Sequence, residues 1–151
     1  MRRLLCGTHT DAAAAGDDRS ADDGRGFVDR FPEPAGLPSW LSQDEFDHYV
    51  AEFSRTGFTG GINWYRNLDR NWELTPQLAG ARVTVPSLFI GGTLDPVLMM
   101  SPPAAAEPWL DDHRGTVLVD GAGHWVQQER PDEVNTALLT FLDTITDRQE
   151  T

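Results

Sequence analysis

The stretch of residues 82–91 constrains the fold of this chain more than any other segment. It reads Arg-Val-Thr-Val-Pro-Ser-Leu-Phe-Ile-Gly and ends at a pair of glycines. A short β-branched and apolar run, with its proline near the start, predicts a buried parallel strand. Residues 116–119, Thr-Val-Leu-Val, predict a second strand, and a short helix is expected between them over residues 104–110. The second half of the chain therefore predicts a βαβ unit.

Three other segments carry the periodicity of helices. Pro131 is a suitable first residue for a final helix, in which apolar side chains recur at intervals of three and one. Ser42 and Glu45 fit a capping box that begins an earlier helix, and Gly57 is a suitable end for it. A further helix is expected over residues 63–72. Strands and helices together predict an α/β protein.

The first part of the chain lacks these patterns. Residues 7–26 are rich in Gly, Ala, Asp, Ser and Thr, with almost no large apolar side chain. Such a segment cannot bury enough surface to offset the entropy of ordering it. Residues 31–38 contain three prolines. We therefore expect a flexible tail and a proline-rich connector over residues 1–37.

Composition narrows the class of protein. The 151 residues leave room for one domain, and 12 Lys and Arg against 24 Asp and Glu give a net charge of -12. This charge argues against binding to nucleic acid or to an anionic membrane surface, which both need clustered basic side chains. The single cysteine, Cys6, cannot form an internal disulfide, and the apolar stretch at residues 4–6 is too short for a signal peptide. We expect a soluble cytoplasmic protein.

An acid and a histidine follow the two predicted strands. Asp95 lies in Gly-Gly-Thr-Leu-Asp-Pro, and His124 lies in Asp-Gly-Ala-Gly-His-Trp. The carboxyl ends of neighbouring parallel strands meet at one edge of a sheet, where ligands bind. The carboxylate would accept from one imidazole nitrogen, which frees the other to take a proton. Alone, an Asp-Pro is usually a turn, and a histidine after a strand is as often structural as functional. Their joint placement favours a catalytic pair.

Longer motifs around these residues resemble a known family. The order of acid and then histidine is similar to that of α/β-hydrolases. Residues 57–67, Gly-Phe-Thr-Gly-Gly-Ile-Asn-Trp-Tyr-Arg-Asn, resemble the end of the lid domain in epoxide hydrolases. Residues 123–135, Gly-His-Trp-Val-Gln-Gln-Glu-Arg-Pro-Asp-Glu-Val-Asn, resemble their histidine loop and last helix. The resemblance covers residues 38–145 and none of residues 1–30.

This resemblance implies the C-terminal portion of an α/β-hydrolase fold, with parallel strands flanked by helices. A helical lid remnant is expected over residues 38–78, and the C-terminal part of the hydrolase core over residues 79–148. The substrate would be a small-molecule epoxide, with no cofactor and no metal.

The resemblance also assigns residues. Tyr65 matches a lid tyrosine, whose phenol would donate a hydrogen bond to the epoxide oxygen. The alternative interpretation is that Tyr65 is simply part of the apolar face of a helix. Haloalkane dehalogenases share the Asp-His arrangement, but the tyrosine motif argues against that branch. The positions beside the acid and the histidine are expected to line the substrate site: Val97, Leu98 and Trp125.

The nucleophile of the family is an aspartate on a sharp strand-to-helix turn before the lid. No such turn is found, because no apolar strand precedes Asp11 or Asp17, and neither Cys6 nor His9 replaces it. The His-Gly-x-Pro oxyanion loop and the first lid tyrosine are absent as well. We expect either the C-terminal piece of an epoxide hydrolase, from a split gene or a mis-called start, or an inert remnant or binding module that keeps the scaffold. In either case the chain alone should not hydrolyse epoxides at an enzymatic rate.

Two structural expectations follow. A carboxylate oxygen of Asp95 should lie roughly 2.6–3.2 Å from Nδ1 of His124, with the Tyr65 hydroxyl directed at Nε2 from the lid side. Two parallel strands normally lie inside a larger sheet, so Leu88, Phe89 and Val117 should lack partners. We therefore expect self-association through the exposed sheet edge.

Overall fold

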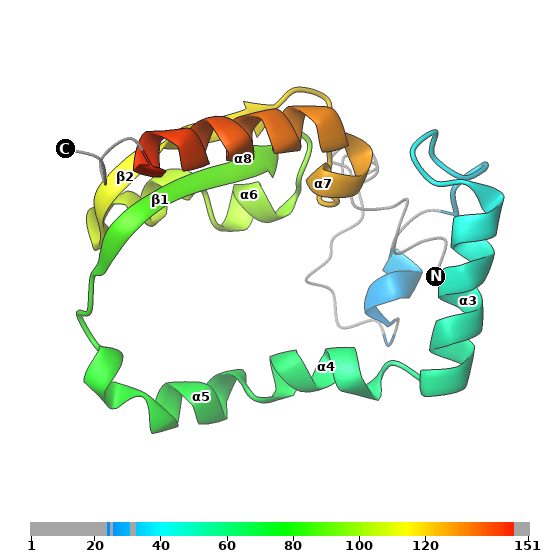
Figure 1. Ribbon diagram of the computed structural model, residues 1–151. Helices are drawn as coiled ribbons and strands as arrows, with labels where there is room; N and C mark the ends of the chain where they lie inside the picture. The colour runs from blue at the N-terminus through cyan, green and yellow to red at the C-terminus, as the bar shows by residue number, and fades with distance from the viewer. Residues whose placement is uncertain (1–23, 25, 31–32, 147–151) are drawn as a thin grey trace.

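A computed structural model of the chain describes residues 24, 26–30 and 33–146. In Figure 1, the strands β1 (Val83–Gly92) and β2 (Leu110–Val119) lie together with helix α8 (Pro131–Thr146), while α4 (Thr59–Arg66) and α5 (Leu68–Leu74) run along the opposite side of the molecule. Most of the expected flexible tail, with Cys6, His9, Asp11 and Asp17, lies outside the described residues.

Helix α3 (Gln43–Thr56) begins at the capping box that the sequence predicts. The Ser42 hydroxyl accepts from the backbone N–H of Glu45 at 3.3 Å, and the Glu45 carboxylate accepts from the N–H of Ser42 at 2.9 Å. The hydrogen bonds from the Ser42 side chain and backbone hold the pKa of Glu45 below its ordinary value. Gly57, with φ of 69°, ends the helix as expected.

The helix expected over residues 63–72 was wrong in its bounds, because the chain forms two helices there. Helix α4 begins earlier, at Thr59, and Asn67 separates it from α5. The Asn67 side chain donates to the carbonyl of Asn63 at 2.7 Å. A side chain that bonds the backbone in this way competes with the helical hydrogen bonds, which explains the break. Neither helix buries a side chain.

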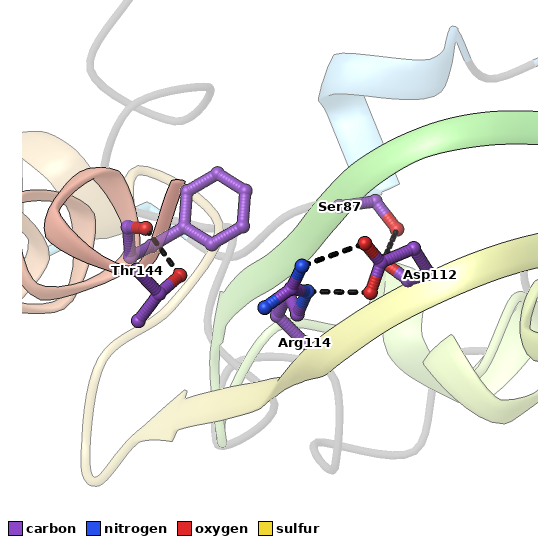
Figure 2. Close-up of polar contacts among 5 residues, drawn as sticks. Ser87, Asp112, Arg114 and Thr144 are labelled. Carbon is purple, nitrogen blue, oxygen red and sulfur yellow. Dashed lines mark hydrogen bonds and ion pairs between the residues drawn. The ribbon is translucent and has the colours of Figure 1, made fainter. Parts of the chain in front are cut away.

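The strands β1 and β2 pair in parallel, from Val83 opposite Leu110 to Gly92 opposite Val119. The expected second strand, residues 116–119, is therefore only the last part of β2. Its first part is mostly polar, and it pairs with β1 through the backbone. Figure 2 shows the Arg114 guanidinium on the Asp112 carboxylate, with Nη2 at 2.7 Å. These hydrogen bonds raise the pKa of Arg114. The start of β2 was not predicted because the sequence pattern for a strand was sought in apolar residues, and this part of the strand has few of them.

The single helix expected over residues 104–110 is replaced by shorter elements. Helix α6 (Val97–Met100) follows β1, and two turns of 3₁₀ helix, η3 (Pro103–Ala105) and η4 (Glu107–Trp109), lead into β2. Prolines at positions 102, 103 and 108 supply no N–H donor, so a continuous α-helix does not form across them. Two further 3₁₀ turns, η1 (Phe27–Arg30) and η2 (Pro76–Leu78), lie earlier in the chain.

The small core lies where the strands end. Val119, Ala122 and Val126 are buried together, and Ile90, Val117 and Val134 pack against them. Val126 begins the short helix α7 (Val126–Glu129), and Val134 belongs to α8, which started at Pro131 as predicted. None of the helices in the described part of the chain is long and apolar enough to cross a membrane.

The loops after β1 and β2 touch through their backbones at Gly92. A Cβ added to Gly92 would lie 2.2 Å from the carbonyl oxygen of Ala122 and 2.4 Å from that of Gly123. The backbone N–H groups of Thr93 and Leu94 donate to Val119 and Ala122, at 3.0 and 2.8 Å. Only a residue without a side chain allows this approach.

We predict that Gly92→Ala separates the two loops, because the methyl group would meet backbone that cannot rotate away. The free energy of unfolding should fall by about 3 kcal/mol or more, which is the upper end of the range for overpacked substitutions. Hydrogen exchange should show loss of protection at the Thr93 and Leu94 amides. Gly61→Ala is the matched control, since nothing lies within 4 Å of its added Cβ and alanine favours helix α4. Equal protection in the two variants would contradict the prediction.

Apolar surface is distributed differently from the sequence-based expectation. Leu88, Phe89 and Val117 are half-buried, because α8 packs on the strands and the strands pair with each other. Large apolar side chains are exposed on the strands at other positions, Val83, Val85 and Leu118. Helices α4 and α5 expose a further group: Ile62, Trp64, Tyr65, Leu68, Trp72 and Leu74.

We predict that the purified chain self-associates, because this apolar surface and both edges of a two-stranded sheet would otherwise face water. Sedimentation velocity should show concentration-dependent species larger than a monomer. A monomer that unfolds in one cooperative step would contradict this.

Candidate active site at the ends of the strands

Asp95 lies three residues after the end of β1 in a tight turn. Its N–H donates to the carbonyl of Gly92 at 3.1 Å, and its Oδ1 accepts from the N–H of Val97 at 2.8 Å. The residue is only 8% exposed. Because the N–H of Val97 donates to Oδ1, the orientation of the carboxylate is fixed. Its second oxygen, Oδ2, points toward the neighbouring loop.

His124 follows β2 on the neighbouring loop. Gly121 has φ of 69°, a left-handed conformation that favours glycine. The N–H of Gly121 donates to the Thr93 hydroxyl at 2.9 Å, and Ala122 is fully buried. The turn after β1 thus holds the histidine loop by side-chain and backbone hydrogen bonds.

The two loops bring Asp95 and His124 into direct contact. Oδ2 of Asp95 lies 3.0 Å from Nδ1 of His124. This distance falls within the range expected from the sequence. The histidine side chain is 39% exposed, whereas the acid is largely shielded from water. A neutral imidazole bonded in this way carries its proton on Nδ1, so the lone pair of Nε2 can accept a proton. This arrangement is suited to general base chemistry.

The three predicted lining residues differ in their relation to this pair. Trp125 contacts His124 edge to face, with ring centroids 5.0 Å apart. Val97 meets Asp95 through its backbone N–H, and its side chain is exposed. Leu98 is half-buried, beside Gly91 at the end of β1. Their roles in binding a substrate remain predictions.

Tyr65 does not join the pair in this structure. Its side chain is 77% exposed on α4, which Figure 1 shows apart from the strands and from α7. The expected orientation of its hydroxyl toward Nε2 is therefore not observed. The physical reason is that α4 buries no side chain, so no packing holds it over the ends of the strands.

Glu129, the last residue of α7, is a further site residue that no sequence motif indicated. Its carboxylate is buried and accepts from the backbone N–H groups of Gly123 and Trp125. The available signal was a glutamate five positions after His124, directly before Arg-Pro. Nothing in the sequence pattern indicates which backbone groups such a carboxylate would bind.

An open groove of about 540 Å³ lies elsewhere, between the start of α3 on one side and α7 with the start of α8 on the other. Its lining includes Trp40, Tyr49, Gln128 and Pro131, but neither Asp95 nor His124. In the described residues, no group of three or more His, Cys, Asp or Glu side chains is arranged to hold a metal ion.

Comparison with known proteins identifies relatives over most of the chain. The model of the "Alpha/beta hydrolase family" matches residues 2–137. This match begins well before residue 38, so the expectation that residues 1–30 carry none of the resemblance was wrong. The small and polar residues of that segment contain no motif by which the family could be recognised from the sequence.

Two curated relatives are epoxide hydrolases. Epoxide hydrolase A of Mycobacterium tuberculosis is 63% identical over 117 residues, which cover 78% of this chain and 36% of that protein. Epoxide hydrolase 1 of Siraitia grosvenorii is 38% identical over 120 residues, covering 72% of this chain and 37% of that protein. The chain therefore spans little more than a third of the length of these relatives.

Solved structures agree with this pattern. Epoxide Hydrolase A from Mycobacterium thermoresistibile superposes with a TM-score of 0.82 at 54% identity, over 94% of this chain and 44% of that one. An epoxide hydrolase from an endophytic Streptomyces superposes with a TM-score of 0.84 at 38% identity, over 97% of this chain and 45% of that one. The two parallel strands, their helices and the family match lead to one conclusion: this chain belongs to the alpha/beta hydrolase family and is similar to a portion of the epoxide hydrolases.

Proposed function

We propose that this chain supplies the histidine and the orienting acid of an epoxide hydrolase, which converts an epoxide and water into a diol. The observation that carries the proposal is the 3.0 Å contact between Asp95 and Nδ1 of His124. The similarity of the chain to Epoxide hydrolase A of Mycobacterium tuberculosis supports the choice of substrate class.

The chemistry proceeds in two steps. An aspartate oxygen attacks a ring carbon of the epoxide, the carbon–oxygen bond of the ring breaks, and the released oxygen takes a proton from a phenol. Nε2 of His124 then takes a proton from water, and the hydroxide attacks the carbonyl carbon of the aspartyl ester. The ester bond breaks, and its departing oxygen takes the proton that remains on the added hydroxide, so the diol leaves and the aspartate is a carboxylate again. The proton on Nε2 of His124 returns to the phenolate, which restores the phenol and the neutral imidazole. Asp95 orients the imidazole and stabilises its charged form.

The aspartate that forms the ester is a separate part of the proposal. Asp95 is unsuited to this role, because its oxygens are engaged by Val97 and His124. We propose that the nucleophile belongs to a segment of the hydrolase other than residues 33–146.

Tyr65 is proposed as the phenol that protonates the released oxygen. Its support is the run Asn63-Trp-Tyr-Arg-Asn67, which resembles the lid of epoxide hydrolases. For this role, α4 must pack over the ends of β1 and β2 in the complete enzyme. The exposed apolar side chains of α4 and α5 provide a surface for that packing.

The alternative is a catalytically inert protein, or a binding module, that keeps the hydrolase scaffold. The exposure of Tyr65 favours it, since a working site would need this residue near His124. Function does not follow from a shared fold alone, so only activity measurements separate the two.

We predict that a chimera regains epoxide hydrolysis when this chain replaces the matching segment of Epoxide hydrolase A of Mycobacterium tuberculosis. In the chimera, His124→Ala and Asp95→Asn should each lower diol formation by roughly 100- to 10,000-fold, because ester hydrolysis loses its base or the orientation of that base. Diol formation is measured by chromatography.

His48→Ala is the matched control, since His48 is exposed on α3 and should leave the rate unchanged. An inactive but folded chimera, or one that is indifferent to His124→Ala, would support the inert scaffold instead. Diol formation by the 151-residue chain alone, lost on His124→Ala, would contradict the external nucleophile.

We predict that Tyr65→Phe in the same chimera slows ring opening by about tenfold or more, because the leaving oxygen loses a proton donor. Rapid-mixing measurements of the first turnover isolate this step from ester hydrolysis. Tyr49→Phe is the control, because Tyr49 is the other tyrosine of the chain and lies on α3. Equal rates for the two variants would refute the role of Tyr65.

A further inference from the structure

The Glu129 carboxylate binds the histidine loop on both sides of His124. Oε2 accepts from the N–H of Gly123 at 2.8 Å, and Oε1 accepts from the N–H of Trp125 at 3.0 Å. Glu129 itself is 6% exposed. One side chain therefore fixes the backbone directly before and directly after the histidine.

These hydrogen bonds matter because the loop has left the β-sheet. Beyond Val119 the strand partner no longer supplies acceptors for its N–H groups, and Gly123 is buried. A buried N–H without a partner is costly, and an ionised acceptor makes a stronger hydrogen bond than a neutral one. Glu129 supplies two such acceptors from a single buried group.

His124 is thus held at two points by two buried acids. Asp95 holds the imidazole at Nδ1, and Glu129 holds the backbone from which the imidazole extends. The direction of a short side chain is set by its backbone, so a shift of the loop would move Nδ1 away from Asp95. Both Glu129 hydrogen bonds to the loop are made to main-chain N–H groups.

We propose that Glu129 is a positioning residue that holds the loop of His124 so that Nδ1 stays within hydrogen-bonding reach of Asp95. The catalytic meaning of this inference rests on the proposed function. The geometric claim does not, and it can be measured on the 151-residue chain without any substrate.

The test is Glu129→Gln, which keeps the size and shape of the side chain. The amide of glutamine retains one acceptor oxygen but presents an NH₂ donor where the second acceptor was. Glu133→Gln is the matched control, because it makes the same change in the first turn of α8 on an exposed side chain. NMR reports the hydrogen exchange of each amide and, through the ring nitrogen shifts, the fraction of His124 with its proton on Nδ1.

We predict exchange roughly 10- to 100-fold faster at the Gly123 and Trp125 amides in Glu129→Gln, as expected for the loss of a hydrogen bond to a charged group. The fraction of His124 protonated on Nδ1 should fall. The amides in the centre of β1 and β2 should be unaffected, and Glu133→Gln should behave like the unchanged chain.

Three results would overturn the inference. Gly123 and Trp125 amides that are unprotected in the unchanged chain would show that Glu129 does not hold the loop. Faster exchange throughout β1 and β2 would make Glu129 a general support of the sheet. Faster exchange in the loop with an unchanged proton position on His124 would show that the imidazole does not depend on Glu129. None of these readouts involves diol formation, so failure of the proposed hydrolase activity is distinguished from failure of this inference.

Discussion

The backbone contact at Gly92 is the constraint on which the rest of the site depends. Here the turn after β1 approaches the loop after β2 so closely that no side chain fits between them. The hydrogen bond from Leu94 to Ala122 joins the two loops across this contact. Asp95 comes one residue later and His124 two residues later on the respective loops, so their distance follows from a rigid backbone junction.

Two buried acids, Asp95 and Glu129, fix the position of His124 at this contact between the loops. Burial of a carboxylate is unfavourable unless hydrogen bonds compensate for the lost water. Asp95 and Glu129 both meet this requirement by binding backbone N–H groups, from Val97 in one case and from Gly123 and Trp125 in the other. The hydrogen bonds that make burial tolerable therefore also immobilise the side chain or loop that chemistry at His124 would require.

The described part of the chain is unevenly packed. Val119, Ala122 and Val126 form a small buried core, and Ala122 lies in the same loop as His124. By contrast, α4 and α5 bury no side chain and expose large apolar ones, among them Trp64 and Trp72. The Asp95–His124 pair is thus formed by contacts internal to this chain, whereas any role for Tyr65 depends on contacts that the described residues do not make.

The sequence by itself determined the strand at residues 82–91, the capped helix at Ser42, the helix from Pro131, and the pairing of Asp95 with His124. Each of these depends on local chemistry or on strand order, which are readable from residue types and spacing. Only the tertiary structure decided the polar first part of β2, the contacts of Glu129 and the exposure of Tyr65. Those features depend on which groups meet across the fold, such as Arg82 with Asp111 or a carboxylate with two backbone N–H groups, and no periodicity along the chain indicates such contacts.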